Sequence, residues 1–141
     1  MTAQMTAQTT DGDAVLALNQ AFYRAFASLD FAAMDALWAR HLPVACLHPG
    51  WTLLMGREAV MDSWRALLAG PQPPSLHPRN EQVVMLGDTA LVLCEEVMPG
   101  TVCAASNLFA REEGGWRLVH HQAGPLAPAA ERGPTPARRL H

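Results

Sequence analysis

The sequence predicts an α+β domain, in which helices from the N-terminal half pack against a sheet supplied mostly by the C-terminal half. Three observations favour this class. Residues 14–29 and 57–69 carry apolar side chains at helical spacing. The Pro49-Gly50 pair separates two short apolar runs, which is typical of a β-hairpin. Residues 81–122 contain successive apolar stretches divided by turn sequences, which predicts an antiparallel meander.

The composition of the 141 residues indicates one domain with an unusually uncharged surface. Charged residues make up 16%, against about 25% in typical domains. This shortage favours a dimer interface, an apolar cavity, or both. The net charge is −3, and all ten basic residues are arginines that form no basic stripe in the folded part. We therefore expect no nucleic-acid partner.

We expect no targeting segment and no membrane-spanning segment in this sequence. Its first residues, MTAQMTAQTTDGD, lack both a basic region and an apolar core, so they do not form a secretory signal. No stretch approaches 18 apolar residues, so we expect no membrane contact. The three cysteines lie in apolar runs without a CxxC pair, which favours reduced thiols and a cytoplasmic location. Residues 1–10 are expected to form a disordered arm.

Two helices are expected before the hairpin. Asp11 or Asp13 is expected to cap the first helix. Asp30 is expected to cap the second, short helix, and Pro43 prevents its continuation. The first helix should bury a stripe of apolar residues at helical spacing, namely Val15, Leu18, Phe22, Phe26 and Leu29.

The hairpin runs over Val44–His48 and Trp51–Met55, and a third helix follows Gly56. That helix should bury Val60, Trp64, Leu67 and Leu68 and end at Gly70-Pro71. Residues 71–78 are expected to form an irregular loop, because proline has no N–H to donate to a sheet.

The meander strands are expected at residues 81–86, 89–98, 101–111 and 116–122, with turns at Gly87-Asp88, Pro99-Gly100 and 112–115. Residues 124–141 are rich in Pro and Ala without periodicity, so we expect a disordered tail.

This order of elements, together with three segments, resembles the SnoaL-like families of the nuclear transport factor 2 superfamily over residues 14–125. The segments are LNQAFYRAFASLDFAAMDALW, the LHPGW…GREAV…SW block, and GGWRLVHHQAG. The resemblance implies a ketosteroid-isomerase-like cone over residues 11–123, with a strongly bent mixed or antiparallel sheet wrapped around three N-terminal helices. It also implies a pocket at the open end and a homodimer through the outer face of the sheet.

A pocket in such a cone needs apolar walls and a few convergent polar groups. The candidates for the walls are Trp38, Trp51 and Trp64, with Tyr23 at the edge of the first helical stripe. Ordinary core packing is the alternative for each. The amide of Asn107, in the middle of a strand with apolar neighbours, could orient a ligand carbonyl.

Three histidines are candidates for the chemistry. His48 ends a strand at a turn, where it either serves a ligand or caps the Pro49-Gly50 turn. His120 and His121 are adjacent on one strand, so only one of them can face the cone. His120 shares a face with Trp116 and Leu118, which favours His120 as the inward residue. A β-bulge would exchange the two.

The same alternation applies to Glu95 and Glu96, one of which must face inward. Inside an apolar cone, Glu96 would have a raised pKa and could act as a general acid or base. The alternative is that the strand has already reached solvent at this point. Since the histidines and cysteines show no paired ligand spacing, we expect no metal site. We also expect no cofactor, and the sequence contains no Gly-rich phosphate loop.

Two functions are compatible with this sequence. In the first, the cone holds a small, largely apolar organic molecule, with cofactor-free acid–base chemistry of the isomerase, cyclase or dehydratase type by His48, His120 and Glu96. In the second, the protein is a non-catalytic homodimeric binding or assembly domain whose cone is filled by its own side chains. Relatives of both kinds exist, so the resemblance leaves the reaction open.

Overall fold

The computed structural model describes residues 10–127 of the chain. These residues form helices α2 (Asp11–Ala27), α3 (Phe31–Leu37) and α4 (Arg57–Leu67). The strands are β1 (Ala45–Leu47), β2 (Leu54–Met55), β3 (His77–Leu86), β4 (Thr89–Met98), β5 (Thr101–Glu112) and β6 (Gly115–Pro125). The predicted α+β class and the order of the elements are confirmed.

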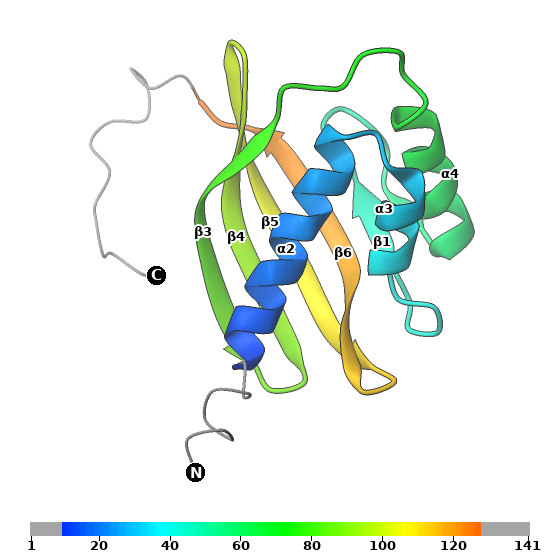
Figure 1. The fold of residues 1–141 in the computed structure, drawn as a ribbon, viewed down its shortest axis with the longest axis vertical. Helices are drawn as coiled ribbons and strands as arrows, with labels where there is room; N and C mark the ends of the chain where they lie inside the picture. Colours follow the sequence, from blue (N-terminus) through cyan, green and yellow to red (C-terminus); the bar gives the residue numbers. More distant parts are fainter. Residues whose placement is uncertain (1–9, 128–141) are drawn as a thin grey trace.

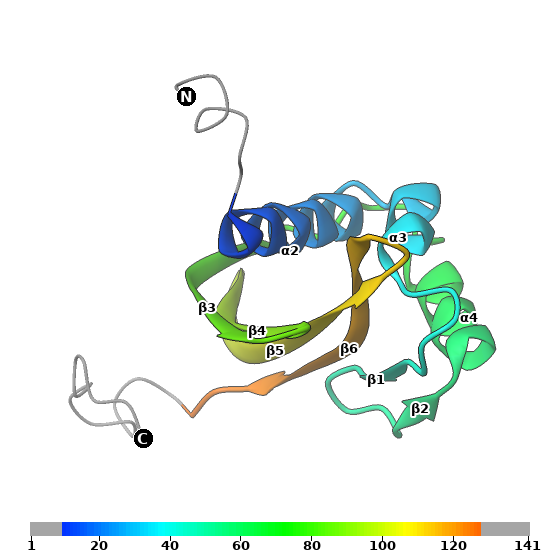
Figure 2. The same ribbon diagram turned by 90° about the horizontal axis from the view of Figure 1, so that it is seen from below.

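The six strands form one open sheet in the order β2-β1-β6-β5-β4-β3. The strands β3 to β6 make the predicted antiparallel meander, and β1 pairs with β6 in parallel. The sheet is strongly bent and curls around α2, which lies across its concave side (Figures 1 and 2). Helices α3 and α4 lie at the end of the sheet near β1 (Figure 2). This is the expected cone of a mixed sheet around three helices.

The first helix is capped by Thr10 and not by Asp11 or Asp13 as expected. The hydroxyl of Thr10 accepts a hydrogen bond from the backbone N–H of Asp13 at 3.0 Å, so Thr10 is the N-cap. Asp11 and Asp13 lie instead in the first turn, where carboxylates favour the positive end of the helix dipole. The second helix is capped as predicted, because the carboxylate of Asp30 accepts from the N–H of Ala33.

A buried carboxylate fixes the chain between α3 and β1. Glu112, at the end of β5, accepts hydrogen bonds from the backbone N–H groups of Arg40, His41 and Leu42, at 2.7 to 2.9 Å. These bonds lower the pKa of Glu112 to about 2. The loop that leads into β1 is therefore bound to the end of β5, next to the turn between β5 and β6.

The turn of the predicted hairpin forms, but its second strand is short. The N–H of Trp51 donates to the carbonyl of His48 at 2.9 Å, and Gly50 has the positive φ of 80° that such a turn requires. Only Ala45 and Cys46 of β1 pair with β2, so residues 51–53 remain outside the ladder. The strand predicted over residues 51–55 is thus mostly loop.

The third strand begins earlier than predicted, at His77, and includes Pro78. The strand order places β3 at the edge of the sheet, where a residue without an N–H is tolerated. The predicted irregular loop over 71–78 therefore ends before these two residues.

The last strand extends to Pro125, past the predicted end of the domain at residue 123, and pairs with β5 over this extension. The arm was predicted at residues 1–10 and the tail at 124–141; of these, residues 1–9 and 128–141 lie outside the described residues. Within residues 10–127, no helix is both long enough and apolar enough to span a bilayer.

Candidate functional site

A cavity of about 200 Å³, which we call the inner cavity, lies among α2, the hairpin turn, α4, β4 and β6. Most of its wall is apolar, and three side chains carry titratable groups. It is lined by Phe26, His48, Pro49, Trp51, Leu67, Leu76, Glu96, Met98 and His121. The structure therefore brings His48, Trp51, Glu96 and His121 together in one space.

The strand register shows which histidine of the pair faces this cavity. His121 lies opposite Asn107, which lies opposite Val92, and all three are buried. His120 lies opposite Leu108 on the other face of the sheet, and its Nδ1 is 3.0 Å from the carbonyl oxygen of Ala45. Cross-strand partners share a face, so His120 points outward.

The expectation that His120 faces the cone was therefore wrong. Pairing between β5 and β6 jumps from Leu108 with His120 to Phe109 with Leu118, which leaves Val119 as the extra residue of a β-bulge. The bulge reverses the alternation, so that Leu118 and His121 both face inward.

The His121 imidazole is 1% exposed and has two polar neighbours. Its Nδ1 is 2.6 Å from Oδ1 of Asn107, and its Nε2 is 3.9 Å from Oε2 of Glu96. Burial, followed by the proximity of the His48 and His120 imidazoles, lowers the pKa of His121 to about 3. His121 is therefore a neutral imidazole near pH 7.

Glu96 is the inward member of its pair, whereas Glu95 lies on the other face and binds Arg79 at 2.8 Å. Glu96 is 3% exposed, and the hydroxyl of Tyr23 donates to Oε2 of Glu96 at 2.8 Å. Burial raises the pKa of Glu96, and the Tyr23 hydrogen bond partly opposes that rise. A carboxyl group with a raised pKa keeps its proton to a higher pH than an ordinary glutamate does, so it can serve as a general acid.

His48 is also buried, and its tautomer follows from its neighbours. The Ser63 hydroxyl donates to the carbonyl of Val60 at 2.6 Å, so its oxygen accepts from Nε2–H of His48 at 2.9 Å. The Nδ1 of His48 is left without a proton, and burial lowers the pKa of this imidazole to about 4. The ring packs edge-on against Trp51 and Trp64.

Of the remaining predicted site residues, only Trp51 lines the cavity. Trp51 lines it but is 42% exposed, and Trp64 lies behind His48 as part of the core. Trp38 was expected to line the cavity, but it does not: it is buried, and its bridge to β6 is at Leu118, nearer the start of that strand than His121.

Tyr23 and Asn107 belong to a hydrogen-bond network below the cavity. The Asn107 amide donates to Oδ1 of Asn19 at 2.8 Å and to the Tyr23 hydroxyl at 3.2 Å. The amide of Asn19 donates in turn to Glu81 at 2.7 Å. Sequence reasoning missed Asn19 and Ser63, although each is a polar residue on the buried face of an amphipathic helix, and that position was the available signal.

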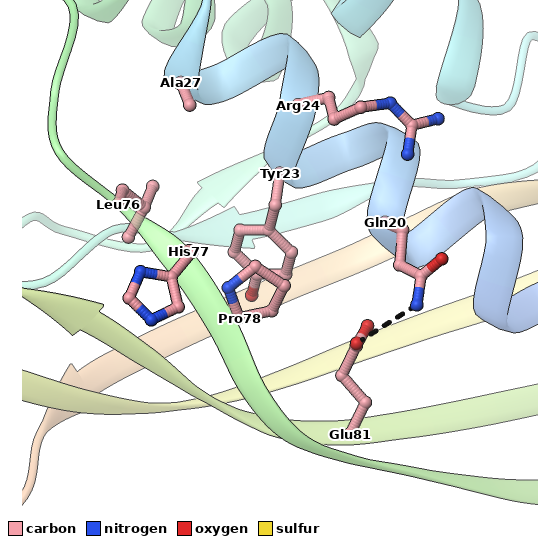
Figure 3. Close-up of a pocket in the computed structure, with 8 residues that line it drawn as sticks. All are labelled: Gln20, Tyr23, Arg24, Ala27, Leu76, His77, Pro78 and Glu81. Carbon is pink, nitrogen blue, oxygen red and sulfur yellow. Dashed lines mark hydrogen bonds between the residues drawn. The ribbon is translucent and has the colours of Figure 1, made fainter.

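A second space, which we call the outer pocket, has a volume of about 300 Å³ and opens between α2 and β3. Tyr23 points from α2 toward the sheet there, and Glu81 of β3 approaches Gln20 of α2 (Figure 3). Leu76 lines both spaces, so it forms part of the partition between them.

The inner cavity combines an acid and bases in an apolar setting. A neutral imidazole and a carboxyl group with a raised pKa lie 3.9 Å apart, an arrangement that can take a proton from one atom of a ligand and return it to another. Among residues 10–127 there is no group of three or more His, Cys, Asp or Glu side chains arranged to hold a metal ion.

The chain is similar to known proteins in sequence and in fold. A family model described as the SnoaL-like domain matches residues 15–128. A curated relative, the F-box protein SKIP8 of Arabidopsis thaliana, is 25% identical over 112 residues, which are 78% of this chain and 48% of that protein. The chain thus spans about half the length of this relative.

Two solved structures are more similar in sequence. A dehydratase candidate of the NTF2-like family from Streptomyces avermitilis is 33% identical, with a TM-score of 0.76 over 84% of this chain and 97% of that one. A candidate association domain of calcium/calmodulin-dependent protein kinase type II from Thiobacillus denitrificans is 32% identical, with a TM-score of 0.71 over 79% and 94%.

Proposed function

Because this chain belongs to the family of SnoaL-like domains, we propose that it binds a small, largely apolar organic molecule in the inner cavity and acts on it by acid–base chemistry without a cofactor. The observation that carries the proposal is the meeting of His48, His121 and Glu96 at one apolar cavity. A cavity of about 200 Å³ has room for a molecule with one small ring.

The proposed division of roles follows from the protonation states. His121, neutral and beside Glu96, is the proposed base, and Glu96 is the proposed acid. His48 is the proposed second polar contact, and Trp51 with Phe26 and Leu67 holds the apolar body. His120, on the outer face, has no role in this proposal. The dehydratase candidate among the relatives supports a reaction of the elimination type.

Binding is tested first, by native mass spectrometry of the purified protein and by thermal shift with a panel of small cyclic ketones. Leu67→Trp fills the cavity, whereas Leu53→Trp adds the same ring at an exposed position. We expect the first variant, and not the second, to lose the co-purifying mass or the thermal shift. Equal binding by both variants would place the ligand elsewhere.

Chemistry is tested by deuterium uptake from D2O into a bound ketone. Abstraction of a C–H proton by His121 should exchange that proton with solvent, and His121→Gln should reduce the exchange at least about tenfold. A ketone that binds without exchanging would favour a binding protein over an enzyme.

The second candidate function is a homodimeric binding or assembly domain, and the outer face of the sheet favours it. Val84, Leu86 and Leu93 are exposed there on β3 and β4. The association-domain relative supports an assembly role. A standard interface would bury about 1,600 Å² in total. Light scattering at micromolar concentration should give a dimer mass that Leu93→Arg reduces and Leu53→Arg does not; a monomeric wild type would exclude the dimer.

A cytoplasmic location is part of the same proposal. Cys46, Cys94 and Cys103 are buried and form no disulfide in the structure. Free buried thiols fit a reducing compartment.

A further inference from the structure

A chain of hydrogen bonds runs from the surface of β3 to the inner cavity. It begins at the carboxylate of Glu81, on the wall of the outer pocket, and passes through the amides of Asn19 and Asn107 to Nδ1 of His121. The three successive distances are 2.7, 2.8 and 2.6 Å. Asn19, Asn107 and His121 are each at most 1% exposed, so the two inner bonds, which join these three residues, are shielded from solvent.

The direction of every bond in this chain follows from its first member. A carboxylate has only acceptors, so Asn19 must turn its NH₂ group toward Glu81. The Oδ1 of Asn19 then faces Asn107 and can only accept, which turns the NH₂ group of Asn107 toward it. The Oδ1 of Asn107 is left to face His121, and it can bond only to an Nδ1 that carries the proton.

The tautomer of His121 has a consequence in the cavity. A neutral imidazole carries one proton, and if that proton is on Nδ1, then Nε2 is a bare acceptor. The Nε2 atom is the one that lies 3.9 Å from Glu96, on the cavity side. The same orientation of Asn107 makes its amide a donor to the Tyr23 hydroxyl, so that the phenol proton goes to Glu96.

We infer that Glu81 is a positioning residue that acts from outside the cavity: through Asn19 and Asn107 it holds His121 as the Nδ1–H tautomer, so that the cavity accepts ligands with an O–H or N–H donor. The ligand class rests on the proposed function of the inner cavity. The tautomer does not, because the hydrogen-bond chain is complete in the unliganded protein.

The test reverses the chain at its first member. Glu81→Lys replaces an acceptor with a donor, so both amides turn over and His121 becomes the Nε2–H tautomer. Glu81→Gln can still offer an oxygen to Asn19 and should retain the Nδ1–H tautomer. Gln82→Lys, at the adjacent exposed position of β3, is the matched control for the added ammonium group.

The readout is the pair of ¹⁵N chemical shifts of the His121 ring in full-length unliganded protein at pH 7. The protonated and unprotonated nitrogens of a neutral imidazole resonate far apart, so the spectrum assigns the tautomer directly. We expect Nδ1–H in the wild type, Glu81→Gln and Gln82→Lys, and Nε2–H in Glu81→Lys. An Nε2–H wild type, or a tautomer unchanged in a folded Glu81→Lys protein, would overturn the inference.

Two additions keep the test decisive. If Glu81→Lys does not fold, Glu81→Leu serves instead, and it should give a mixture of both tautomers because it removes the fixed acceptor. A pure Nδ1–H spectrum would then overturn the inference.

The ligand class is tested separately with 4-methylphenol and 4-fluorotoluene, which have similar shapes. We expect the phenol to bind the wild type about 3- to 10-fold more tightly, the worth of one hydrogen bond, and equal affinities would overturn the ligand class.

The two proposals fail in different ways. If neither probe binds, the proposed function of the cavity loses its support, while the ¹⁵N shifts still decide the role of Glu81. If the shifts contradict the relay but the probes bind, the cavity keeps its proposed function without it.

Discussion

The imidazole of His48 packs edge-on against the indole of Trp64, with ring centroids 4.7 Å apart and planes at 88°. Trp64 makes the same kind of contact with Phe22 and Phe26 of α2. One fully buried side chain of α4 thus supports both the main helix and a proposed site residue.

Replacing this side chain should be costly. We expect Trp64→Ala to lower the free energy of unfolding by about 3–5 kcal/mol, because it opens a large hole among three aromatic rings. Trp64→Phe should cost less, since the indole Nε1 has no hydrogen-bond partner among residues 10–127. Trp51→Ala, at a 42% exposed position, is the control and should cost about 1 kcal/mol or less. Urea denaturation measures all three, and a small loss for Trp64→Ala would contradict the packing.

The two buried imidazoles make stability depend on pH. Burial lowers the pKa of His121 to about 3 and that of His48 to about 4, from an ordinary 6.5. At pH values between these and 6.5, the two imidazoles bind more protons in the unfolded chain than in the folded protein. Their contribution to the free energy of unfolding is therefore fully present above pH 6.5 and is lost as the pH is lowered. Each imidazole should contribute a slope of up to about 1.4 kcal/mol per pH unit.

Urea denaturation of the wild type and of His121→Gln, at intervals from pH 7 to pH 4, checks this expectation. The variant should lose stability less steeply, because one of the two imidazoles is gone. Parallel pH profiles would show that His121 is not buried as a neutral group.

Replacing Glu112 should destabilise the loop between α3 and β1 more than it destabilises the rest of the molecule. We expect Glu112→Ala to remove the hydrogen-exchange protection of the Arg40, His41 and Leu42 amides, which have no other acceptor among the described residues. The contribution of the carboxylate is present above its unfolded pKa of 4.5 and is lost as the pH falls toward 2. Glu113→Ala, at the exposed neighbouring position, should leave these amides protected.

Tyr23→Phe removes the hydroxyl that donates to Glu96, and it should raise the pKa of Glu96 further. A raised pKa means that the folded protein holds the proton more tightly than the unfolded chain does. Ionisation of Glu96 therefore reduces stability as the pH rises from 4.5 through the folded value, and the variant should be weakest at alkaline pH. We expect a loss of about 1–3 kcal/mol at pH 8. The ¹³C shift of the Glu96 carboxyl group during a pH titration measures the change, and an unchanged titration would contradict the hydrogen bond.

The fold could be predicted because local signals agree with the final structure. The turn glycines, the helical stripes and the apolar strands each specify their own element without long-range information. The differences arise where the position in the sheet decides: Pro78 is accepted into β3 only because that strand is at the edge, and residues 51–53 leave the ladder because β2 has one partner.

The site was less predictable, because it depends on one extra residue in β6. Alternation alone assigns His120 to the interior, and only the pairing with β5 reveals the bulge at Val119. Asn19 and Ser63 were missed since a single polar residue on a buried helical face does not indicate its partner. That partner lies on a distant strand for Asn19 and in the hairpin for Ser63.

The parallel pairing of β1 with β6 also determines when the site can exist during synthesis of the chain. Ala45, Cys46 and Leu47 can join the meander only through residues 120–122, which are made after the other described helices and strands. Until then the cavity lacks His121, and β1 has only the two residues of β2 beside it. Closing so long a loop is an entropically expensive step that must await the meander. The cavity is therefore completed by β6, the last of the described strands to be made, and a nascent chain that ends before β6 lacks His121 and has no complete cavity.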